Sequence, residues 1–362
     1  MKINEELLEY NKKIIQNIQS GQNDYICFGA GKACMDFIHN VCQAEKFQAP
    51  EFICDNNEKI WGKQIKIGDK EVPVVSPEKI RELDIDRTYI FMSATLPLGI
   101  LNDLIYKYRC VYHKIVYAKS LETYFFFLKN RKRVELTYNQ LEDQKSKTAY
   151  EEFLNTLLRG NFFCPGIYTG HPYWGNDVIN GLQKGDTIVH AGVFDGADIQ
   201  RALIEHEEVT VHGFEPDINM YQKAKERFSN APNIKLYPYA LSDKTEELSF
   251  NMDGSSGAVV KDEANPGQKI NVTRIKATSI DEVLINEKID LITLDIEGLE
   301  PKAIMGAEKI ICTQKPRLAI CVYHELEHYV LIAEMLKKLN PEYKLYFRQH
   351  SPVAIESVLY AI

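Results

Sequence analysis

The chain has 362 residues, about twice the usual domain size of roughly 100–200 residues, so we expect two domains. Its hydrophobic share of 45% and charged share of 26% are those of a globular protein and exclude a largely disordered chain. The net charge of −8 argues against a protein that binds nucleic acid through the phosphate backbone, because such binding needs a surplus of cations.

The cysteines and the N-terminal segment indicate the cellular compartment of the protein. The eight cysteines are scattered without a C-x-x-C pair, and several lie in apolar runs such as YICFG and LAICVY. We therefore expect buried thiols in a reducing compartment rather than a disulfide framework or a metal cluster. The first 20 residues lack the apolar core of a signal peptide, and no apolar run approaches the ~18 residues of a membrane span. These features predict a cytoplasmic protein without membrane insertion.

A first α/β series is predicted in roughly residues 20–118, after an N-terminal helix. A strand, a glycine-rich turn and an amphipathic helix follow one another in YICFGAGKACMDFIHNV, and further strands are predicted in EFICDNN, VPVVSPEKIREL and TYIFMSAT. This alternation predicts a doubly wound, Rossmann-like unit. We assign residues 1–118 to this domain and residues 119–160, which are charged and helical in period, to a connector.

A second α/β series begins near residue 176, in a domain that we assign to residues 161–362. Five strands are predicted, in DTIVHAG, VTVHGF, NIKLYPYA, IDLITLD and PRLAICVY, with helices between them. The runs YKLYFRQH and IESVLYAI then predict a terminal antiparallel hairpin. The stretch ELSFNMDGSSGAVVKDEANPGQKINVTRIKA, placed where a helix would otherwise cross, predicts an inserted hairpin that can shape a substrate pocket.

The first two strand ends of this series carry residues suited to a nucleotide-like cofactor. Gly192 and Gly196 allow a tight turn and a close approach to a ligand, with Asp195 between them, although the same turn would also serve a plain strand-to-helix connection. Glu215 ends the next strand, where an acidic side chain can accept hydrogen bonds from a ribose diol. The alternative for Glu215 is a helix N-cap, for which Asp217 is better placed.

The third and fourth strand ends are also polar. Ser242 and Asp243 either contact an adenine amino group or cap a turn. The fourth strand ends in three carboxylates, of which Asp295 and Glu297 should face the same crevice as the other strand ends. There they could orient an acceptor, hold an ammonium group or bind magnesium. Alternatively, Glu300, and with it Glu297, caps the following helix.

The fifth strand ends in a histidine. His324 is our candidate general base, because imidazole titrates near neutral pH and its neighbours lie at the same edge of the predicted sheet. His328 follows at a spacing that occurs in metal sites, but no zinc-protease pattern accompanies the pair. We therefore assign no metal ligands.

The elements HAGVFDG, GFEP, ALSD, TLDIEGLE and LAICVYHELEH, in this order and spacing, resemble the FkbM family of S-adenosylmethionine-dependent methyltransferases. Members of that family are typically O-methyltransferases that act on sugars or natural products. The resemblance covers roughly residues 160–362 and implies a class I methyltransferase fold with S-adenosyl-L-methionine as the cofactor. The D-I-E-G-x-E and V-Y-H elements are fairly specific, whereas the glycine turn is generic.

The resemblance also implies roles for individual residues. The cofactor-binding residues that it implies are Gly192, Asp195 and Gly196 near the methionine part, Glu215 at the ribose, Ser242 and Asp243 near adenine, and Tyr173 closing the pocket. Asp295 and His324 would border the transferring methyl, with Asp295 orienting the acceptor and His324 as the base. One departure is His190, where family members usually carry an acidic residue that helps to anchor the ammonium end of the cofactor.

The N-terminal series supports a rival hypothesis. Its GAGKAC element holds Gly29 and Gly31 but has Cys34 where a dinucleotide fingerprint has a third glycine, and Asp55 follows on the next strand. A rival enzyme would use NAD(P) or a nucleotide sugar there, although no Tyr-x-x-x-Lys follows in that domain. A third hypothesis is a non-catalytic scaffold that binds the cofactor or a partner. The main hypothesis predicts a sugar, glycan or other small-molecule acceptor, and the sequence is compatible with a homo-oligomer.

Overall fold

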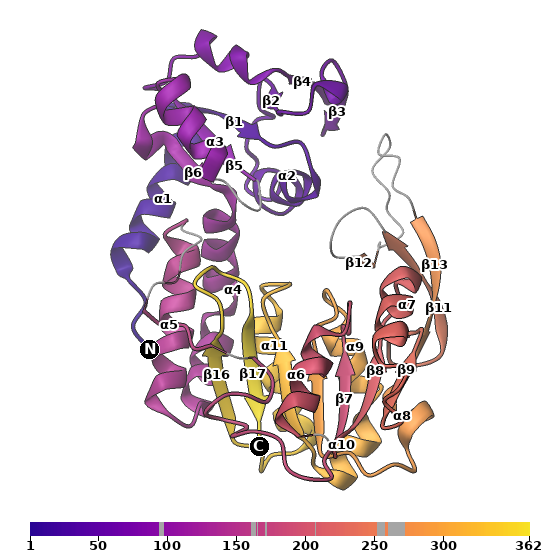
Figure 1. Ribbon diagram of the computed structural model, residues 1–362. Helices are drawn as coiled ribbons and strands as arrows, with labels where there is room; N and C mark the ends of the chain where they lie inside the picture. Colours follow the sequence, from indigo (N-terminus) through magenta and orange to yellow (C-terminus); the bar gives the residue numbers. More distant parts are fainter. Residues whose placement is uncertain are drawn as a thin grey trace. The chain divides into compact units, whose positions relative to one another are not determined.

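The computed structural model describes residues 1–93, 98–160, 164, 166–170, 172–206, 208–251, 258–259 and 272–362 (Figure 1). The chain forms two compact units. One unit comprises Lys2–Arg131 and Glu151–Phe163, and the other comprises Met1, Lys132–Tyr150 and Cys164–Ile362. None of the helices in the described ranges combines the length and the hydropathy that crossing a bilayer requires.

The N-terminal unit is built on a six-stranded sheet in the order β3-β4-β2-β1-β5-β6. Its strands are β1 (Asp24–Phe28), β2 (Ile53–Cys54), β3 (Gln64–Ile67), β4 (Lys70–Val75), β5 (Thr88–Met92) and β6 (Ile115–Tyr117). Only the β3–β4 pair is antiparallel among the described pairings of this sheet. The central strand β1 is buried from its second residue onward and β5 is buried throughout, as expected for parallel strands covered on both faces. The predicted Rossmann-like unit is confirmed.

The helices of the N-terminal unit include two that continue beyond it. They are α1 (Glu5–Gln19), α2 (Lys32–Phe37), α3 (Leu98–Asn102) and the first or last parts of α4 (Ala118–Gln140) and α5 (Gln144–Leu158). The stretch that the sequence marks as helical in period therefore forms two helices, α4 and α5, and each contributes residues to both units.

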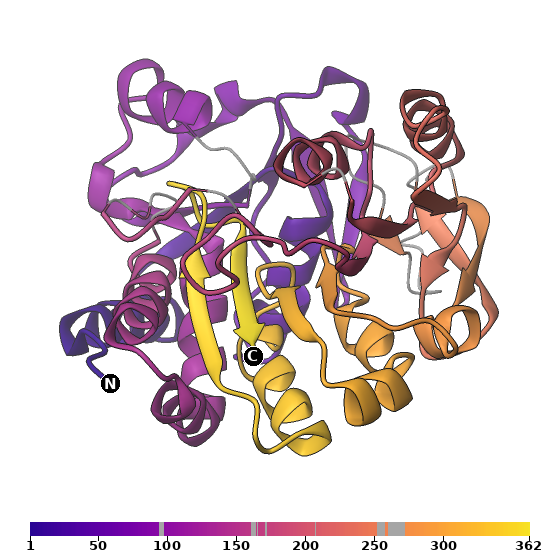
Figure 2. The same cartoon turned by 60° about the horizontal axis from the view of Figure 1, so that its bottom comes forward.

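The second unit carries a seven-stranded sheet in the order β16-β17-β15-β14-β7-β8-β9. Its strands are β7 (Thr187–Ala191), β8 (Thr210–Phe214), β9 (Ile234–Tyr237), β14 (Leu291–Leu294), β15 (Arg317–Cys321), β16 (Leu345–Gln349) and β17 (Ser357–Ala361). Strand β17 runs antiparallel to β15 and β16, and the pairings among β15, β14, β7, β8 and β9 are parallel. Figure 2 shows β16 and β17 side by side at one edge of this sheet. The predicted doubly wound sheet with a terminal antiparallel hairpin is confirmed.

Helices connect these strands. They are α6 (Ala197–Glu205), α7 (Ile218–Arg227), α8 (Ile280–Leu284), α9 (Glu300–Met305), α10 (Glu308–Gln314) and α11 (His328–Leu339). Asp217 is the N-cap of α7, as predicted, because its carboxylate accepts hydrogen bonds from the amides of Asn219 and Met220. In the sheet order, β8 lies on one side of β7 and β14 lies on the other. The carboxyl ends of β7 and β14 therefore meet at a switch point, where doubly wound sheets bind ligands.

The third strand of the sheet is shorter than we predicted. Strand β9 ends at Tyr237, and Pro238, which has no N–H to donate to a ladder, follows it. The chain resumes as β10 (Ala240–Leu241), which belongs to a separate four-stranded sheet in the order β10-β13-β11-β12. Ser242 and Asp243 therefore follow a strand of the small sheet rather than one of the main sheet.

The small sheet contains the inserted hairpin. Its other strands are β11 (Glu246–Asn251), β12 (Ala258–Val259) and β13 (Val272–Thr278). Strands β11 and β13 pair antiparallel, which confirms the predicted hairpin. The glycine-, serine-, asparagine- and proline-rich loop that we predict in it falls largely on residues 252–257 and 260–271, which lie outside the described residues.

The cysteines follow the prediction with one exception. All eight are free thiols, and seven of them are buried. The prediction is wrong for Cys312, which is exposed. The apolar run KIIC lies on α10, where Ile310 and Ile311 face the interior while the next residue turns toward solvent.

A buried guanidinium on strand β16 forms hydrogen bonds with the start of α5 and with the segments before α5 and β7. Arg348 is 2% exposed and donates hydrogen bonds to Asp143 Oδ2 at 2.6 Å, to Asp177 Oδ2 at 3.0 Å and to Ser146 Oγ at 2.7 Å. Its side-chain contact, together with that of Lys145, lowers the pKa of Asp177 to about 2. A buried charge is stable only when its donors are satisfied, so these contacts depend on one another.

We predict that Arg348→Met lowers the free energy of unfolding by about 2–3 kcal/mol, because the buried hydrogen bonds are lost and Asp143 and Asp177 lose their contacts with the guanidinium. Urea unfolding followed by circular dichroism measures this change. The matched control is Arg274→Met, since Arg274 is 78% exposed in its side chain and lies 3.4 Å from Glu247. Exposed pairs contribute roughly 0–1 kcal/mol, and equal midpoints for the two variants would contradict the prediction.

Candidate active site

The glycine turn after β7 brings two strand ends together. Gly192 and Gly196 have φ of +87° and +86°, in the left-handed region that favours glycine. A Cβ on Gly192 would lie 2.0 Å from the backbone oxygen of Asp295, and the Asp295 amide donates a hydrogen bond to Ala191 O at 3.1 Å. Glycine at this position is therefore what allows the end of β14 to approach the end of β7.

Glu215, which follows β8, holds the glycine turn in place. Its Oε2 accepts a hydrogen bond from the Phe194 amide at 2.7 Å, and its Oε1 accepts one from the Asp217 amide at 2.8 Å. The side chain is largely buried, and this burial raises its pKa against the opposing effect of the two amides. A carboxylate has about four acceptor positions, so two remain for other donors. These two positions are available to the ribose hydroxyls, and the ribose contact of Glu215 stays a prediction.

Three other predicted cofactor residues make contacts within the protein. Asp195 lies 3.3 Å from Arg227 Nη2, on α7. Ser242 is fully buried and donates a hydrogen bond to Glu246 Oε1 at 2.5 Å. Asp243 is half-buried, so it is the more accessible member of the predicted adenine pair. The roles of these three residues in cofactor binding stay predictions.

Asp295 is held by two tyrosines at the end of β14. The Tyr173 hydroxyl donates a hydrogen bond to Oδ2 at 2.8 Å, and the Tyr323 hydroxyl donates one to Oδ1 at 2.9 Å. Burial, together with the Asp295 charge, raises the pKa of both phenols, so both remain neutral donors. Tyr173 is the residue predicted to close the pocket, whereas no role was predicted for Tyr323. The sequence signal for Tyr323 is its position directly before His324, at the end of the fifth strand.

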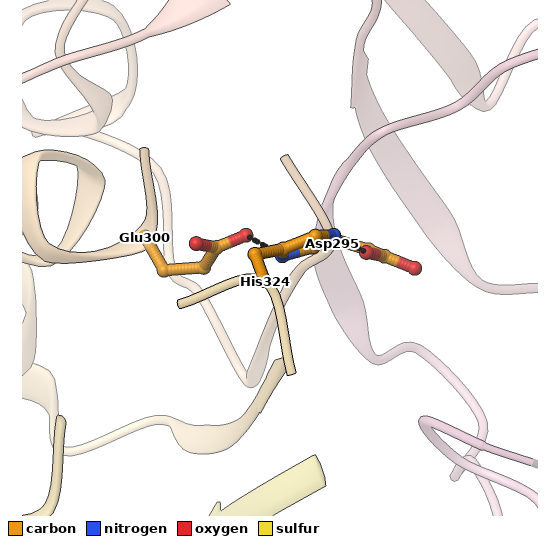
Figure 3. A group of neighbouring side chains, drawn as sticks. All are labelled: Asp295, Glu300 and His324. Carbon is orange, nitrogen blue, oxygen red and sulfur yellow. Dashed lines mark ion pairs between the residues drawn. The ribbon is translucent and has the colours of Figure 1, made fainter. Parts of the chain in front are cut away.

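His324 follows β15 and lies between two carboxylates. Figure 3 shows the imidazole ring between Asp295 and Glu300. Its Nε2 lies 3.3 Å from Asp295 Oδ1 and 3.6 Å from Glu297 Oε2, while its Nδ1 lies 3.0 Å from Glu300 Oε1. Burial alone would lower the pKa of His324, but the contact with Glu300 and the charges of the other carboxylates raise it to about 9.

Glu300 is the most deeply buried member of this group. It is fully buried at the first position of α9, where its Oε1 accepts a hydrogen bond from the Ile296 amide at 2.9 Å and its Oε2 lies 3.3 Å from His328 Nδ1. Burial acts to raise the pKa of Glu300, but the contact with His324 and the charges of both histidines lower it overall. A helix cap was the alternative prediction for Glu300, and these contacts with the two histidines were not predicted.

The donor atoms of Asp295, Glu300 and His324 all lie within 4.8 Å of one another. Such a set has the chemistry to receive a divalent cation. Asp295 and Glu300, however, contact different nitrogens of the His324 ring. The ring therefore lies between the two carboxylates, and the three groups do not point toward one common ligand position. The predicted roles of Asp295 and His324 stay predictions.

His190 lies on β7, opposite Thr293 of β14. It is buried, its Nδ1 lies 2.6 Å from Thr293 Oγ1, and its ring contacts those of Tyr173 and Trp174 edge to face. Burial lowers the pKa of His190, so the ring is neutral at neutral pH. A neutral ring cannot supply the negative charge that an acidic residue would supply there.

The N-terminal unit has a similar turn after its first strand. Gly29 has φ of +99°, and the Ala30 amide donates a hydrogen bond to Asp55 Oδ2 at 2.7 Å. In both units, an acidic residue after the second strand thus holds the glycine turn after the first. Cys34, in the place of a third glycine, is buried. The rival hypothesis of a nucleotide in this unit stays a prediction.

Comparison with known proteins finds a family match for part of the chain. Residues 190–348, which hold the strand ends and the histidine described above, match the model of the Methyltransferase FkbM domain. The chain therefore carries an FkbM methyltransferase domain. This FkbM domain includes Asp295, Glu300 and His324, and the predicted resemblance is confirmed.

Two relatives extend the comparison. Over 170 residues the chain is 25% identical to the 2-O-methyltransferase NoeI of Sinorhizobium fredii (strain NBRC 101917 / NGR234), covering 42% of this chain and 69% of that protein. The crystal structure of methyltransferase FkbM from Methylobacillus flagellatus KT matches with a TM-score of 0.63 at 16% identity, over 99% of each chain. At that identity the second match shows the fold alone. The predicted class I methyltransferase fold of the FkbM domain is confirmed.

Proposed function

We propose that the protein transfers a methyl group from S-adenosyl-L-methionine to a hydroxyl of a sugar, a glycan or its nucleotide-linked precursor. The FkbM domain supports methyl transfer, and a relative named a 2-O-methyltransferase supports oxygen as the acceptor atom. The observation that carries the proposal is the placement of His324 Nε2 beside Asp295 at the end of β14. A hydroxyl acceptor needs a proton acceptor of this kind, because the attacking oxygen must lose its proton.

The residues around the switch point fit the expected cofactor. S-adenosyl-L-methionine supplies an electrophilic methyl group on a positively charged sulfur. Glu215 keeps two acceptor positions for the hydroxyls of its ribose, beside the turn that Gly192 permits. Carboxylates at this edge, Asp295 and Glu297 among them, attract a cationic ligand. Asp243 is the accessible side chain for its adenine.

The proton is handled by His324 and its neighbours. The acceptor hydroxyl is placed beside Asp295, whose orientation is fixed by the two tyrosine hydroxyls. S-adenosyl-L-methionine held at this edge would supply the methyl group to the acceptor oxygen and leave as S-adenosylhomocysteine, and His324 Nε2 would take the hydroxyl proton. The imidazolium that results is stabilised by Asp295 on one side and by Glu300 on the other.

The pKa of His324 gives the proposal a pH dependence. Because the base must be neutral to accept a proton and its pKa is raised to about 9, most of the free enzyme is in the wrong protonation state at neutral pH. We predict that kcat/KM rises about tenfold per pH unit from neutrality and levels off near the pKa of the free enzyme. Initial rates measured between pH 6 and 10 in buffers of constant ionic strength test this. A profile flat through that range contradicts the role of His324 as the base.

Ligand-induced stabilisation separates the proposal from its rival. A ligand that binds the native state alone stabilises it by about 2.7 kcal/mol at a hundred times its Kd. We predict that S-adenosyl-L-methionine and S-adenosylhomocysteine raise the Tm. NAD and nucleoside diphosphate sugars are screened in parallel. Stabilisation by NAD alone would contradict the proposal and favour an enzyme that uses the N-terminal unit.

A further inference from the structure

We propose that Glu300 is a positioning residue for the base: its buried carboxylate, 3.0 Å from His324 Nδ1, keeps the ring proton on that nitrogen and so leaves the Nε2 lone pair for the acceptor hydroxyl. This inference rests on the proposed function, because it assigns Glu300 a part in the same proton transfer. It goes beyond a helix-capping role, since it makes the carboxylate act through His324 on the reaction.

The sheet topology brings the two residues together. Glu300 begins α9, shortly after β14, and His324 follows β15 by three residues. Strands β14 and β15 are parallel neighbours, so their carboxyl ends share an edge. The turn between β14 and α9 contains Glu297 in the left-handed region at φ of +55° and Gly298 at φ of +101°. This turn brings Glu300 back toward the strand ends.

The burial of Glu300 requires a cationic partner. An isolated carboxylate out of water is costly, and a buried charge persists where hydrogen bonds and an opposite charge compensate it. Glu300 receives one amide hydrogen bond from Ile296 at 2.9 Å and a longer one from Gly298 at 3.5 Å, and its remaining close contacts are to His324 and His328. The lowered pKa of Glu300 agrees with an ionised carboxylate that faces imidazole.

The two histidines are not equivalent partners of Glu300. His324 meets carboxylates on both sides, Asp295 and Glu297 at Nε2 and Glu300 at Nδ1, and its pKa is raised to about 9. Burial, the largest effect, lowers the pKa of His328, and the charge of His324 lowers it further. The charges of Glu300, Glu325 and Glu327 oppose this without reversing it. The proton that faces Glu300 therefore belongs to His324, and His328 contributes only a longer contact, 3.3 Å from its Nδ1 to Glu300 Oε2.

The arrangement fixes which nitrogen of His324 is free for chemistry. A neutral imidazole has one N–H and one lone pair. The contact of Nδ1 with Glu300 is the shorter one, 3.0 Å against 3.3 Å from Nε2 to Asp295, and both oxygens of Asp295 already accept tyrosine hydroxyls, so the tautomer with its proton on Nδ1 is favoured. The lone pair is then on Nε2, which faces Asp295. Among the described residues, neither nitrogen of His324 makes an aligned hydrogen bond, and its contacts with Glu300 and Asp295 are charge contacts of 3.0 and 3.3 Å. Nε2 therefore keeps its capacity for an acceptor hydroxyl.

The direct test measures the titration of the His324 ring and not the turnover of the enzyme. In protein labelled with ¹⁵N-histidine, the ring resonances of His324, assigned by their loss in His324→Ala, are titrated in wild type, Glu300→Gln and Glu300→Asp. We expect the pKa of His324 to fall by more than one unit in Glu300→Gln and by less in Glu300→Asp, which retains the charge. We also expect the Nδ1-protonated tautomer to lose its predominance in Glu300→Gln. An unchanged titration and tautomer in folded Glu300→Gln overturns the proposal, and so does a pKa that falls as far in Glu300→Asp as in Glu300→Gln.

The control for a merely structural effect is Glu308→Gln. Glu308 also begins a helix, α10, but it is exposed, so its charge is removed without touching His324. In Glu300→Gln the rising limb of kcat/KM should move to lower pH and the alkaline plateau should fall at least tenfold, with partial rescue in Glu300→Asp. Glu308→Gln should leave the limb in place. If Glu300→Gln only lowers the stability and the rising limb of kcat/KM stays at the same pH, the positioning role is wrong.

The two proposals fail differently. If His324→Ala retains wild-type turnover, the proposed function loses its base, although the NMR titration can still show that Glu300 controls the ring. If His324→Ala is inactive and the His324 titration does not respond to Glu300→Gln, the base stands and the positioning role of Glu300 is overturned.

Discussion

Replacing His324 with alanine is expected to reduce kcat for methyl transfer roughly 10²–10⁴-fold, the usual contribution of a positioned general base. The loss should be largest where the wild-type base is neutral, above its pKa of about 9, and smaller near pH 7. Affinity for S-adenosyl-L-methionine, measured by calorimetry, should change little, because the predicted ribose and methionine contacts come from other strand ends. Single-turnover rates at saturating cofactor measure the effect on the chemical step.

The control is His39→Ala, in the N-terminal unit. His39 is exposed and its ring lies 3.1 Å from Gln43, so its loss should leave both turnover and stability near the wild-type values. A His324→Ala protein that binds the cofactor normally and keeps wild-type turnover would end the assignment of His324 as the base.

Gly192→Ala is expected to have the second large effect. Alanine at φ of +87° is strained by roughly 1–2 kcal/mol, and its Cβ would lie 2.0 Å from the backbone oxygen of Asp295. Relief of that contact must separate the ends of β7 and β14, with a further cost of about 1–3 kcal/mol. We therefore expect a loss of stability of roughly 2–5 kcal/mol together with loss of cofactor binding, because the turn and Asp295 move apart.

Gly185→Ala separates strain from steric conflict. Gly185 has φ of +83°, but a Cβ there would meet nothing within 4 Å among the described atoms. The two substitutions therefore carry similar backbone strain, and the difference in their denaturation midpoints reports the contact with Asp295. Equal destabilisation by both, with cofactor affinity unchanged in Gly192→Ala, would contradict the role that we give to this glycine.

Sequence reasoning located the site because strand ends in a parallel sheet share an edge. Asp295 and His324 are far apart in the chain, yet each follows a predicted buried strand, and the carboxyl-end rule alone places them together. The structure puts Asp295 Oδ1 and His324 Nε2 3.3 Å apart. Periodicity was sufficient here because these strands are buried on both faces and read as continuous apolar runs.

The same reasoning missed features that depend on tertiary burial. Glu300 lies in a sequence position typical of a helix start, and only packing shows that it is fully buried against a histidine. Pro238 breaks the third strand, a local rule that we overlooked because the apolar pattern continues across it. Strand β3 has alternating polar residues and is exposed along much of its length, so it has no long apolar run to mark it.

Transfer of a labelled methyl group tests the central claim most directly. The full-length protein is incubated with [methyl-¹³C]S-adenosyl-L-methionine and a panel of glycans, free sugars and nucleotide sugars, with and without a chelator, and products are examined by ¹³C NMR. We predict a methyl ether signal on one sugar oxygen, formation of S-adenosylhomocysteine, and loss of both in His324→Ala. A methyl group on nitrogen or carbon, or undiminished ether formation by His324→Ala, would contradict it.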